Sequence, residues 1–371
     1  MYIYKPDYLV MTAGPTMVSG NVLQARAKAF GNPDLDPDFF TFYQSVCDKL
    51  KIFFGTEKAQ MIIMNGEGML ALDAACASLT EKGDEVLVIS NGVFGEGFKD
   101  LILQYGGNVT IYESDWKSGL SASKLEEFLK SKSNFKFATI VHCDTPSGVL
   151  NDIGPICNLL KSKGILTVVD TVAAVGGTEL KVDEWNIDIA LGGSQKVFSA
   201  PSGLSLLSIS DDAWDAIENR TTPIPSFYCN LSYWKNCVEE MLFPYTMPAS
   251  DIMGLNAALG NLLSERPNRV IERHEEMRDY TIERLKDMGI ELYLNDSFSP
   301  TVTAFLVPEG YDAQEIINHM KNKYKILIAN SYGPLKNKVL RIGHMGENAR
   351  FDRVMFTLDN LEKTLCDLKR G

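Results

Sequence analysis

The chain has 371 residues, of which 45% are hydrophobic, and a formal net charge of −12 at pH 7 with a pI near 5.0. This length and apolar content predict more than one domain and a substantial buried core. A protein with this negative net charge lacks the basic surface that binding to a nucleic-acid phosphate backbone requires. Nucleic acid is therefore not expected as a partner.

The first 20 residues are expected to form an extended arm and not a packed element, because they contain the turn-prone run Ala13-Gly14-Pro15. They carry no basic segment followed by an apolar one, and no apolar run approaches the roughly 20 residues that span a bilayer. The seven cysteines are scattered, without a C-x-x-C pair or histidines at metal-ligand spacing. We therefore expect reduced thiols, no metal, no membrane partner and a cytoplasmic location.

Short β-branched runs alternate with amphipathic segments between residues 60 and 210. The runs predict strands at 60–64, 85–89, 108–112, 136–142, 165–169, 187–191 and 204–209. Helical patterns lie near 68–80, 95–105, 121–132 and 152–163. This alternation predicts an α/β fold with a mainly parallel seven-stranded sheet and helices on both faces.

The pattern changes after residue 250. A long helical stretch, 250–288, is expected to break or kink at Pro267. It is followed by short strands at 290–294, 301–307, 325–329 and 339–343 and by helices near 312–323 and 350–368. We therefore predict an N-terminal arm (1–20), a large ligand-binding domain (21–265) and a smaller C-terminal α+β domain (266–371).

Two polar residues follow neighbouring strands of the predicted sheet. Asp170 ends the run 165–169, and Lys196 follows the glycine-containing run 190–195. Ligands bind at the carboxyl ends of parallel strands. There, an amine can form a Schiff base with an aldehyde cofactor while a carboxylate pairs with its protonated ring nitrogen. The alternative is that Lys196 is a solvated lysine in a turn and that Asp170 is a helix N-cap residue.

A glycine-rich turn, Asn65-Gly66-Glu67-Gly68-Met69-Leu70-Ala71, joins a predicted strand to a helix. Its backbone N–H groups and the helix dipole can cradle a phosphate. The same run matches G-x-G-x-x-A, a dinucleotide fingerprint, with Asp84 or Glu85 as the ribose-binding acid, and a plain tight turn is a third interpretation. A monophosphate cofactor is favoured, because a dinucleotide leaves Asp170 and Lys196 without a role.

Five motifs together resemble the class V, fold-type I aminotransferases that depend on pyridoxal 5′-phosphate. They are Gly66-Glu67-Gly68-Met69, Asn91-Gly92-Val93-Phe94-Gly95, Val169-Asp170-Thr171-Val172-Ala173, Gly193-Ser194-Gln195-Lys196 and Val339-Leu340-Arg341-Ile342-Gly343. Within the class the chain is most similar to the alanine–glyoxylate and serine–pyruvate branch. The similarity extends over nearly the whole chain.

The resemblance implies a role for each matching residue. Gly68 and Met69 would bind the phosphate through their N–H groups, and Gln195 would add a side-chain donor. Phe94 and Val172 would contact the two faces of the ring, and Thr145 would lie near its phenolic oxygen. The other residues expected to contact the cofactor are Gly66, Glu67, Asp170, Lys196 and Thr246. Lys196 would also act as the general base that moves a proton on the substrate.

Arg341 would hold the substrate carboxylate, with Gly14 also in the substrate pocket. The alternative for Arg341 is an inter-domain salt bridge to a protein carboxylate. His142, just before the Thr145 loop, is expected to be structural.

Three positions depart from the family pattern. A tyrosine that reaches the phosphate from the neighbouring subunit is replaced by Phe243, which cannot donate a hydrogen bond, although Thr246 is retained. Tyr245 is a candidate substitute. Phe94 stands where that branch has a tryptophan, and the Glu67 carboxylate is expected to point away from a phosphate, which would repel it.

The sequence thus predicts a homodimeric transaminase that moves an amino group from a small amino acid, of the alanine or serine type, to a 2-oxo acid such as glyoxylate or pyruvate by a ping-pong mechanism. One alternative is another substrate in the same class: 2-aminoethylphosphonate, ureidoglycine, or cysteine in a desulfuration. Desulfuration needs a mobile catalytic cysteine, whereas Cys366 resembles an ordinary helix residue. A nicotinamide-dependent oxidoreductase and a regulatory domain without turnover are two further alternatives.

Overall fold

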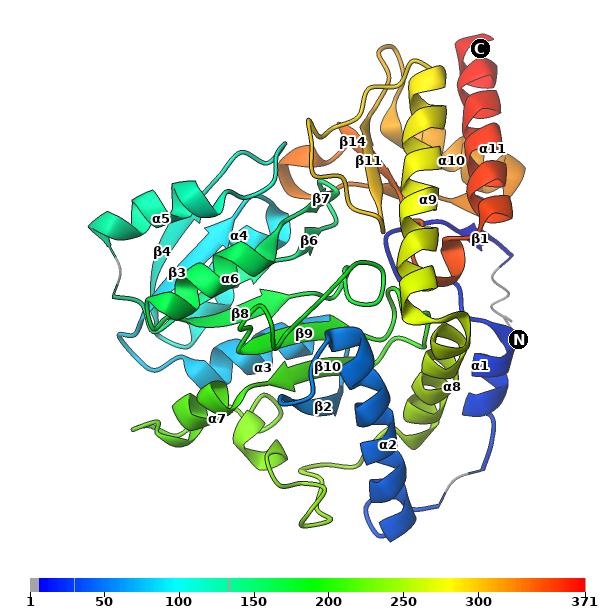
Figure 1. The fold of residues 1–371 in the computed structure, drawn as a ribbon. Coiled ribbons are helices and arrows are strands. Elements are labelled where there is room, and N and C mark those ends of the chain that lie inside the picture. The colour runs from blue at the N-terminus through cyan, green and yellow to red at the C-terminus, as the bar shows by residue number, and fades with distance from the viewer. Residues whose placement is uncertain (1–6, 30, 133, 371) are drawn as a thin grey trace.

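The computed structural model describes residues 7–29, 31–132 and 134–370, and its centre is a seven-stranded sheet in the order β2-β10-β9-β8-β5-β3-β4 (Figure 1). The strands are β2 (Gln60–Asn65), β3 (Glu85–Ser90), β4 (Asn108–Glu113), β5 (Phe137–Val141), β8 (Leu166–Asp170), β9 (Ile189–Gly193) and β10 (Leu204–Ile209). Only β10 is antiparallel to its neighbours. The predicted α/β class and the mainly parallel sheet are confirmed.

Helices cover both faces of this sheet. Figure 1 shows α5 (Ala122–Ser131) and α6 (Ile153–Ser162) on one face, and α3 (Gly68–Leu79) and α4 (Val93–Gln104) on the other. These four helices match the predicted ones to within two residues at each end. Three more helices in this part of the chain were not predicted: α1 (Gly20–Arg26), α2 (Pro37–Phe54) and α7 (Asp211–Glu218).

Strand direction places the predicted site. Strands β8 and β9 are adjacent and parallel, with Asp170 paired to Leu191, so their carboxyl ends meet at one edge of the sheet. Asp170 is the last residue of β8, and Lys196 follows three residues after β9 ends. The two residues therefore emerge side by side above the same edge.

The long C-terminal helical stretch is divided where the sequence predicts. Helix α8 (Ala249–Glu265) ends one residue before α9 (Pro267–Asp287), and Arg266 between them has a φ of 77°. Proline fits the first turn of α9 because its missing N–H would be unpaired there anyway. The division of the chain near residue 265 into two domains remains our proposal.

The C-terminal part has its own sheet and hydrophobic core. Strands β11 (Thr303–Leu306), β14 (Val339–Ile342) and β13 (Ala329–Asn330) form an antiparallel three-stranded sheet. Helices α10 (Ala313–Tyr324) and α11 (Phe351–Arg370) pack beside it, and α9 runs along the junction with the larger sheet (Figure 1).

Three local predictions were wrong. Residues 290–294 form no strand but a single bridge, Leu292 to Phe305. The run 325–329 is split into β12 (Ile326–Leu327) and β13. The arm does pack, because β1 (Leu9–Val10) pairs in parallel with β12 and Met11 is fully buried. A strand whose partner lies more than 300 residues later leaves no local pattern; residues 1–6 of the arm lie outside the described residues.

Across the described part of the chain, no helix is both long enough and apolar enough to pass through a bilayer.

Candidate active site

A cavity of about 250 Å³ opens at the carboxyl ends of β8 and β9. It brings together ten of the predicted site residues: Gly14, Glu67, Gly68, Met69, Phe94, Thr145, Asp170, Val172, Gln195 and Lys196. Three other predicted residues, Gly66, Thr246 and Arg341, do not line it. The structure therefore brings most of the predicted residues to one cavity, from segments as far apart in the sequence as Gly14 and Lys196.

Lys196 lies against the N-terminal arm. Its Nζ donates to the carbonyl oxygen of Ala13, and the Cα of Gly14 is so close that a Cβ there would lie 2.4 Å from the lysine Cδ. Burial lowers the pKa of Lys196, and the positive charge of Arg341 lowers it further. A lower pKa increases the neutral fraction of the amine, which is the form that attacks a carbonyl.

The loop after Lys196 is fixed by Ser199, which has a φ of 52°. Its N–H donates to the carbonyl oxygen of Lys196 at 3.0 Å, and its Oγ accepts from the N–H of Glu347 at 2.8 Å. Thr16 from the arm shares a hydrogen bond with the same Oγ at 3.0 Å. Three separate parts of the chain thus hold the backbone that carries the lysine.

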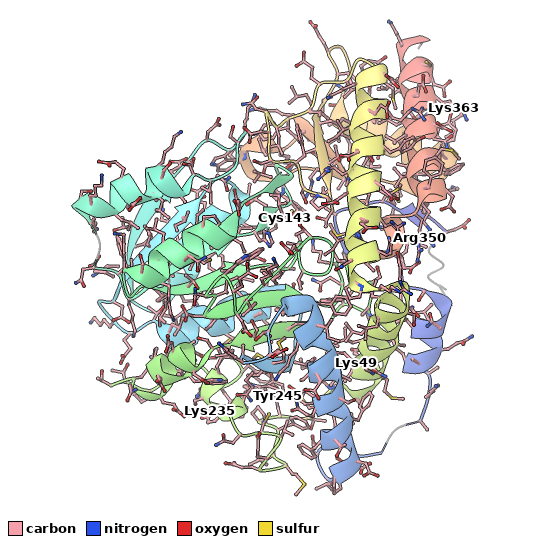
Figure 2. All side chains as sticks on the ribbon, viewed as in Figure 1. Lys49, Cys143, Lys235, Tyr245, Arg350 and Lys363 are labelled. Atoms are coloured by element: carbon pink, nitrogen blue, oxygen red, sulfur yellow. The ribbon has the colours of Figure 1, made fainter. Side chains whose placement is uncertain are left out.

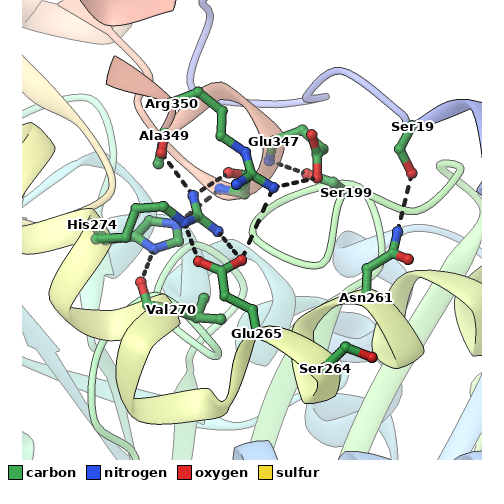
Figure 3. A network of polar contacts seen from close by, with 12 residues as sticks. Ser19, Ser199, Asn261, Ser264, Glu265, Val270, His274, Glu347, Ala349 and Arg350 are labelled. Atoms are coloured by element: carbon green, nitrogen blue, oxygen red, sulfur yellow. Dashed lines mark hydrogen bonds and ion pairs between the residues drawn. The ribbon is translucent and has the colours of Figure 1, made fainter. Parts of the chain in front are cut away.

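A polar network at the junction of α8 and α9 supports this loop (Figure 3). Arg273 pairs with Glu265 through two nitrogens and donates to the carbonyl oxygens of Gly346 and Ala349 at 2.9 and 2.8 Å. The N–H of Gly346 donates to Nε2 of His274 at 2.8 Å. The network fixes residues 346–349, which contact Ser199.

Asp170 is buried at the floor of the cavity and accepts a hydrogen bond from the N–H of Val172 at 2.9 Å. Burial raises its pKa to about 6, and the nearby Asp144 acts in the same direction, while Lys196 opposes both. A cation placed against this carboxylate would stabilise its charged form. The alternative of a plain N-cap does not explain its place in a cavity beside an amine.

Sequence reasoning missed Asp144. This fully buried residue follows β5, and its Oδ2 accepts from the N–H groups of Phe94 and Gly95 at 2.8 and 3.3 Å. It thereby holds the first turn of α4, which presents Phe94 to the cavity. A Cβ on Gly92 would lie 2.3 Å from the Asp144 carboxyl carbon. A carboxylate just beyond a buried strand was the available signal.

Arg341 lies on β14, behind Thr145. Its Nε and Nη2 donate to the carbonyl oxygen of Asn330 at 3.1 and 2.6 Å, and its Nη1 donates to that of Thr145 at 3.3 Å. The guanidinium also lies 4.9 Å from the centre of the Tyr332 ring. Among the described residues no carboxylate forms an ion pair with it, so the predicted alternative of a protein salt bridge is not seen. A buried guanidinium with neutral partners fits an incoming anion.

The cradle at the start of α3 differs from the prediction. Glu67 is the N-cap residue, and its Oε2 accepts from the N–H of Met69 at 3.1 Å. The carboxylate therefore turns toward the helix N-terminus at the exposed mouth of the cavity and does not point away. The reason is physical, because a helix N-terminus with unpaired N–H groups and a positive dipole attracts the nearest carboxylate.

The segment predicted to reach a neighbouring subunit lies outside the cavity. Thr246 Oγ1 donates to Asp34 at 2.9 Å. Phe243 is buried and stacks on Phe40 with ring centres 4.5 Å apart, so it is a core residue here. Tyr245 packs against other aromatic rings, and Figure 2 shows it on the β2 side of the sheet, away from Cys143, which lines the cavity.

The cavity matches a pyridoxal group at its ring end. Asp170 offers a buried partner for a ring nitrogen, Lys196 offers the amine, and Phe94 and Val172 offer apolar contacts. The opposite end fits a phosphate poorly, because the Glu67 carboxylate already accepts from the N–H predicted to bind it.

Comparisons with known proteins identify the family. The model of the class V aminotransferases matches residues 10–335. The chain is 30% identical to an alanine–glyoxylate aminotransferase of Drosophila melanogaster, covering 100% of this chain and 95% of that one. Its structure resembles the ureidoglycine–glyoxylate aminotransferase of Bacillus subtilis (TM-score 0.95, 30% identity, 99% and 95% covered) and the pyridoxamine–pyruvate aminotransferase of Mesorhizobium loti (0.93, 28%, 100% and 95%). The chain belongs to the class V aminotransferases, a family of transaminases that depend on pyridoxal 5′-phosphate.

Proposed function

We propose that the protein moves an amino group from a small amino donor to a small 2-oxo acid by a ping-pong mechanism. The observation that carries this proposal is the meeting of Lys196 and Asp170 in one cavity, at the ends of β9 and β8. The names of the three relatives share glyoxylate or pyruvate as a substrate, which supports a small 2-oxo acid here. Their donors differ, so the donor remains to be measured.

Three residues of the chain carry out this scheme, and Lys196 serves two of its steps. With a pyridoxal group bound, Lys196 would hold its aldehyde through the ε-amine and, once the substrate amine has taken its place, would move the proton at the substrate Cα. Asp170 keeps the ring nitrogen protonated, and the bound cofactor supplies the electron sink that makes this proton acidic. Arg341 holds the substrate carboxylate through the N–H groups that its backbone partners leave free.

We propose a cytoplasmic homodimer. Large apolar side chains are exposed along the segment that precedes Thr246, among them Phe227, Tyr233 and Leu242. Exposed apolar clusters of this kind mark protein contacts, and Thr246 and Tyr245 follow directly in the chain. All seven cysteines are free, in keeping with a reducing compartment. Light scattering coupled to gel filtration tests the dimer.

The same-class alternatives are less well supported by the cavity. Cys366 lies on α11 and is not among the cavity residues. Cys143 does line the cavity, but burial raises its pKa to about 11, and its Sγ is hydrogen-bonded to Ser299. The raised pKa of Cys143 disfavours the thiolate that desulfuration requires.

The test is a half-reaction. Borohydride should trap the cofactor on the Lys196 peptide, as measured by mass spectrometry, and Lys196→Ala should abolish both trapping and turnover. The half-reaction itself uses protein that has not been treated with borohydride, and the trapped protein is its reference. The untreated protein is mixed with alanine, serine, 2-aminoethylphosphonate, ureidoglycine or pyridoxamine as the amino donor, and then with glyoxylate or pyruvate as the acceptor. A Lys196→Ala protein that transaminates like the wild type, or a copurified nicotinamide cofactor, would refute the proposal.

A further inference from the structure

We propose that Glu67 selects the 5′ substituent of the pyridine ring, so that this cradle takes the unphosphorylated vitamers pyridoxal and pyridoxamine at least as readily as the phosphorylated one. The inference rests on the proposed function, because Lys196 and Asp170 place the ring with its 5′ carbon toward α3. A neutral hydroxymethyl group can donate a hydrogen bond to the Glu67 carboxylate. A phosphate dianion accepts hydrogen bonds and is repelled by that carboxylate.

The position of Glu67 is built into the fold. Ser205 on β10 donates to the carbonyl oxygens of both Gly66 and Glu67, at 3.1 and 2.6 Å. The N–H of Gly66 donates to the carbonyl oxygen of Gly203 at 2.8 Å. These bonds fix the loop backbone, so the carboxylate remains within reach of the Met69 N–H.

The helix N-terminus is already used within the chain. Glu67 accepts from Met69 through its side chain and from Leu70 through its carbonyl oxygen, at 3.1 and 2.8 Å. A phosphate would have to displace the Glu67 carboxylate from Met69 before it could use that N–H. A hydroxymethyl group needs no such displacement, since it can bind the carboxylate where it lies.

The charges that line the cavity point the same way. Among the described lining residues, the charged side chains are Glu67, Asp170 and Lys196, and Lys196 is committed to the aldehyde end. No arginine or second lysine is among those lining residues. Within the described part of this one chain, the cradle therefore offers no cation to balance a dianion.

Gln195 is a further polar group of the cavity that a neutral hydroxyl could use. Its Oε1 is buried, lies over Gly193 and has no hydrogen-bond partner, although the residue lines the cavity. An unpaired buried acceptor calls for a donor, which a hydroxyl supplies and a phosphate dianion does not. Rotation of the amide would present its NH₂ group instead, so Gln195 can serve either vitamer and Glu67 is the residue that discriminates.

A competition experiment tests this selection. The full-length protein, freed of cofactor with hydroxylamine, is mixed with equal amounts of pyridoxal and pyridoxal 5′-phosphate and then reduced with borohydride. Mass spectrometry gives the ratio of the two adducts on the Lys196 peptide. The ratio is divided by that on N-acetyl-lysine in the same mixture, because the two aldehydes differ in intrinsic reactivity. We expect a normalised ratio of pyridoxyl to phosphopyridoxyl adduct of one or more.

The variants Glu67→Gln and Glu67→Ser should lower this ratio by roughly 10- to 100-fold, the value of one hydrogen bond to a charged group. Asp312→Asn is the matched control, since Asp312 caps α10 in the C-terminal part of the chain and lies outside the cavity. A wild-type ratio below one, or an unchanged ratio in both Glu67 variants, overturns the inference while the transaminase proposal stands. The absence of any adduct on Lys196 overturns both. If the variants fail to fold, the wild-type ratio alone decides.

Discussion

The Nη1 of Arg341 donates to the carbonyl oxygen of Thr145 at 3.3 Å, which joins the C-terminal sheet to the loop after β5. Three of the five guanidinium N–H groups bind backbone carbonyls, so the side chain is oriented without any charge being neutralised. Burial lowers the pKa of Arg341, which shows the electrostatic cost of holding it there. An anion from solution would offset that cost.

Arg341→Lys should raise KM for the amino acid and the oxo acid by roughly 100-fold and change kcat less, because one ammonium replaces a two-pronged contact. Steady-state kinetics with the donor found in the half-reaction measure this split. Arg269→Lys is the control, since Arg269 forms an exposed pair with Glu272 on α9. An unchanged KM in Arg341→Lys would show that the carboxylate is bound elsewhere.

Gly14→Ala should impair the formation of the Schiff base at Lys196. Gly14 has a φ of 94°, and an added Cβ would lie 2.4 Å from the lysine Cδ, so the lysine must move. A displacement of this size costs about 100-fold in rate, which borohydride trapping with time should reveal. Gly20→Ala is the control, because a Cβ there meets no atom within 4 Å. Equal trapping rates in the two variants would refute this role.

The parts of the fold that the sequence predicted are those with strong local patterns. Buried strands such as β5 and β10 are short and mainly apolar, and Pro267 is the first residue of the helix that follows the predicted break. The short strand β1 and the split between β12 and β13 depend on pairing across more than 300 residues. No local pattern encodes such pairing, and the two-residue strands are too short to alternate.

The same contrast holds for the site. Asp170 ends β8 and Lys196 follows β9, and both strands were predicted, so both residues were expected at the carboxyl ends of strands. Asp144 was missed because its role is to accept from Phe94 and Gly95 in the first turn of α4, a contact between segments about 50 residues apart. The direction of Glu67 was predicted wrongly, because repulsion by a ligand was weighed and attraction by the helix N-terminus was not. Competing electrostatic effects of similar size need coordinates to be ranked.

Asp170→Asn should lower kcat by roughly 10²- to 10³-fold, because a neutral amide cannot stabilise a protonated ring nitrogen. Trapping on Lys196 should persist, since the amine and the apolar ring contacts are unchanged. The pKa of Asp170, about 6 in the free protein, predicts that cofactor loading weakens as the pH falls through that value. In Asp170→Asn, cofactor loading should not weaken as the pH falls through 6, because the amide does not titrate. An Asp170→Asn enzyme with wild-type kcat would rule out the proposed pairing.

His274 should make the stability of the protein depend on pH. Burial, with Arg273 nearby, lowers its pKa to about 3, whereas an unfolded histidine titrates near 6.5. Between pH 3 and pH 6.5 only the unfolded chain binds a proton at this histidine. The contribution of His274 to folding stability is therefore complete above pH 6.5 and is lost as the pH falls toward 3. Between pH 7 and pH 5 the loss is about 2 kcal/mol. His274→Gln keeps an acceptor for the N–H of Gly346 but cannot titrate.

Urea unfolding of both proteins at several pH values measures this effect as a difference. His142 and His344, with pKa values lowered to about 3 and about 4, act in the same direction, while Asp144 and Asp170, raised to about 6, act in the opposite one. These four groups are common to both proteins and cancel in the comparison. The wild type should therefore lose about 2 kcal/mol more than the variant between pH 7 and pH 5. Parallel curves would mean that His274 is protonated in the folded protein, in which case its Nε2 could not accept from Gly346.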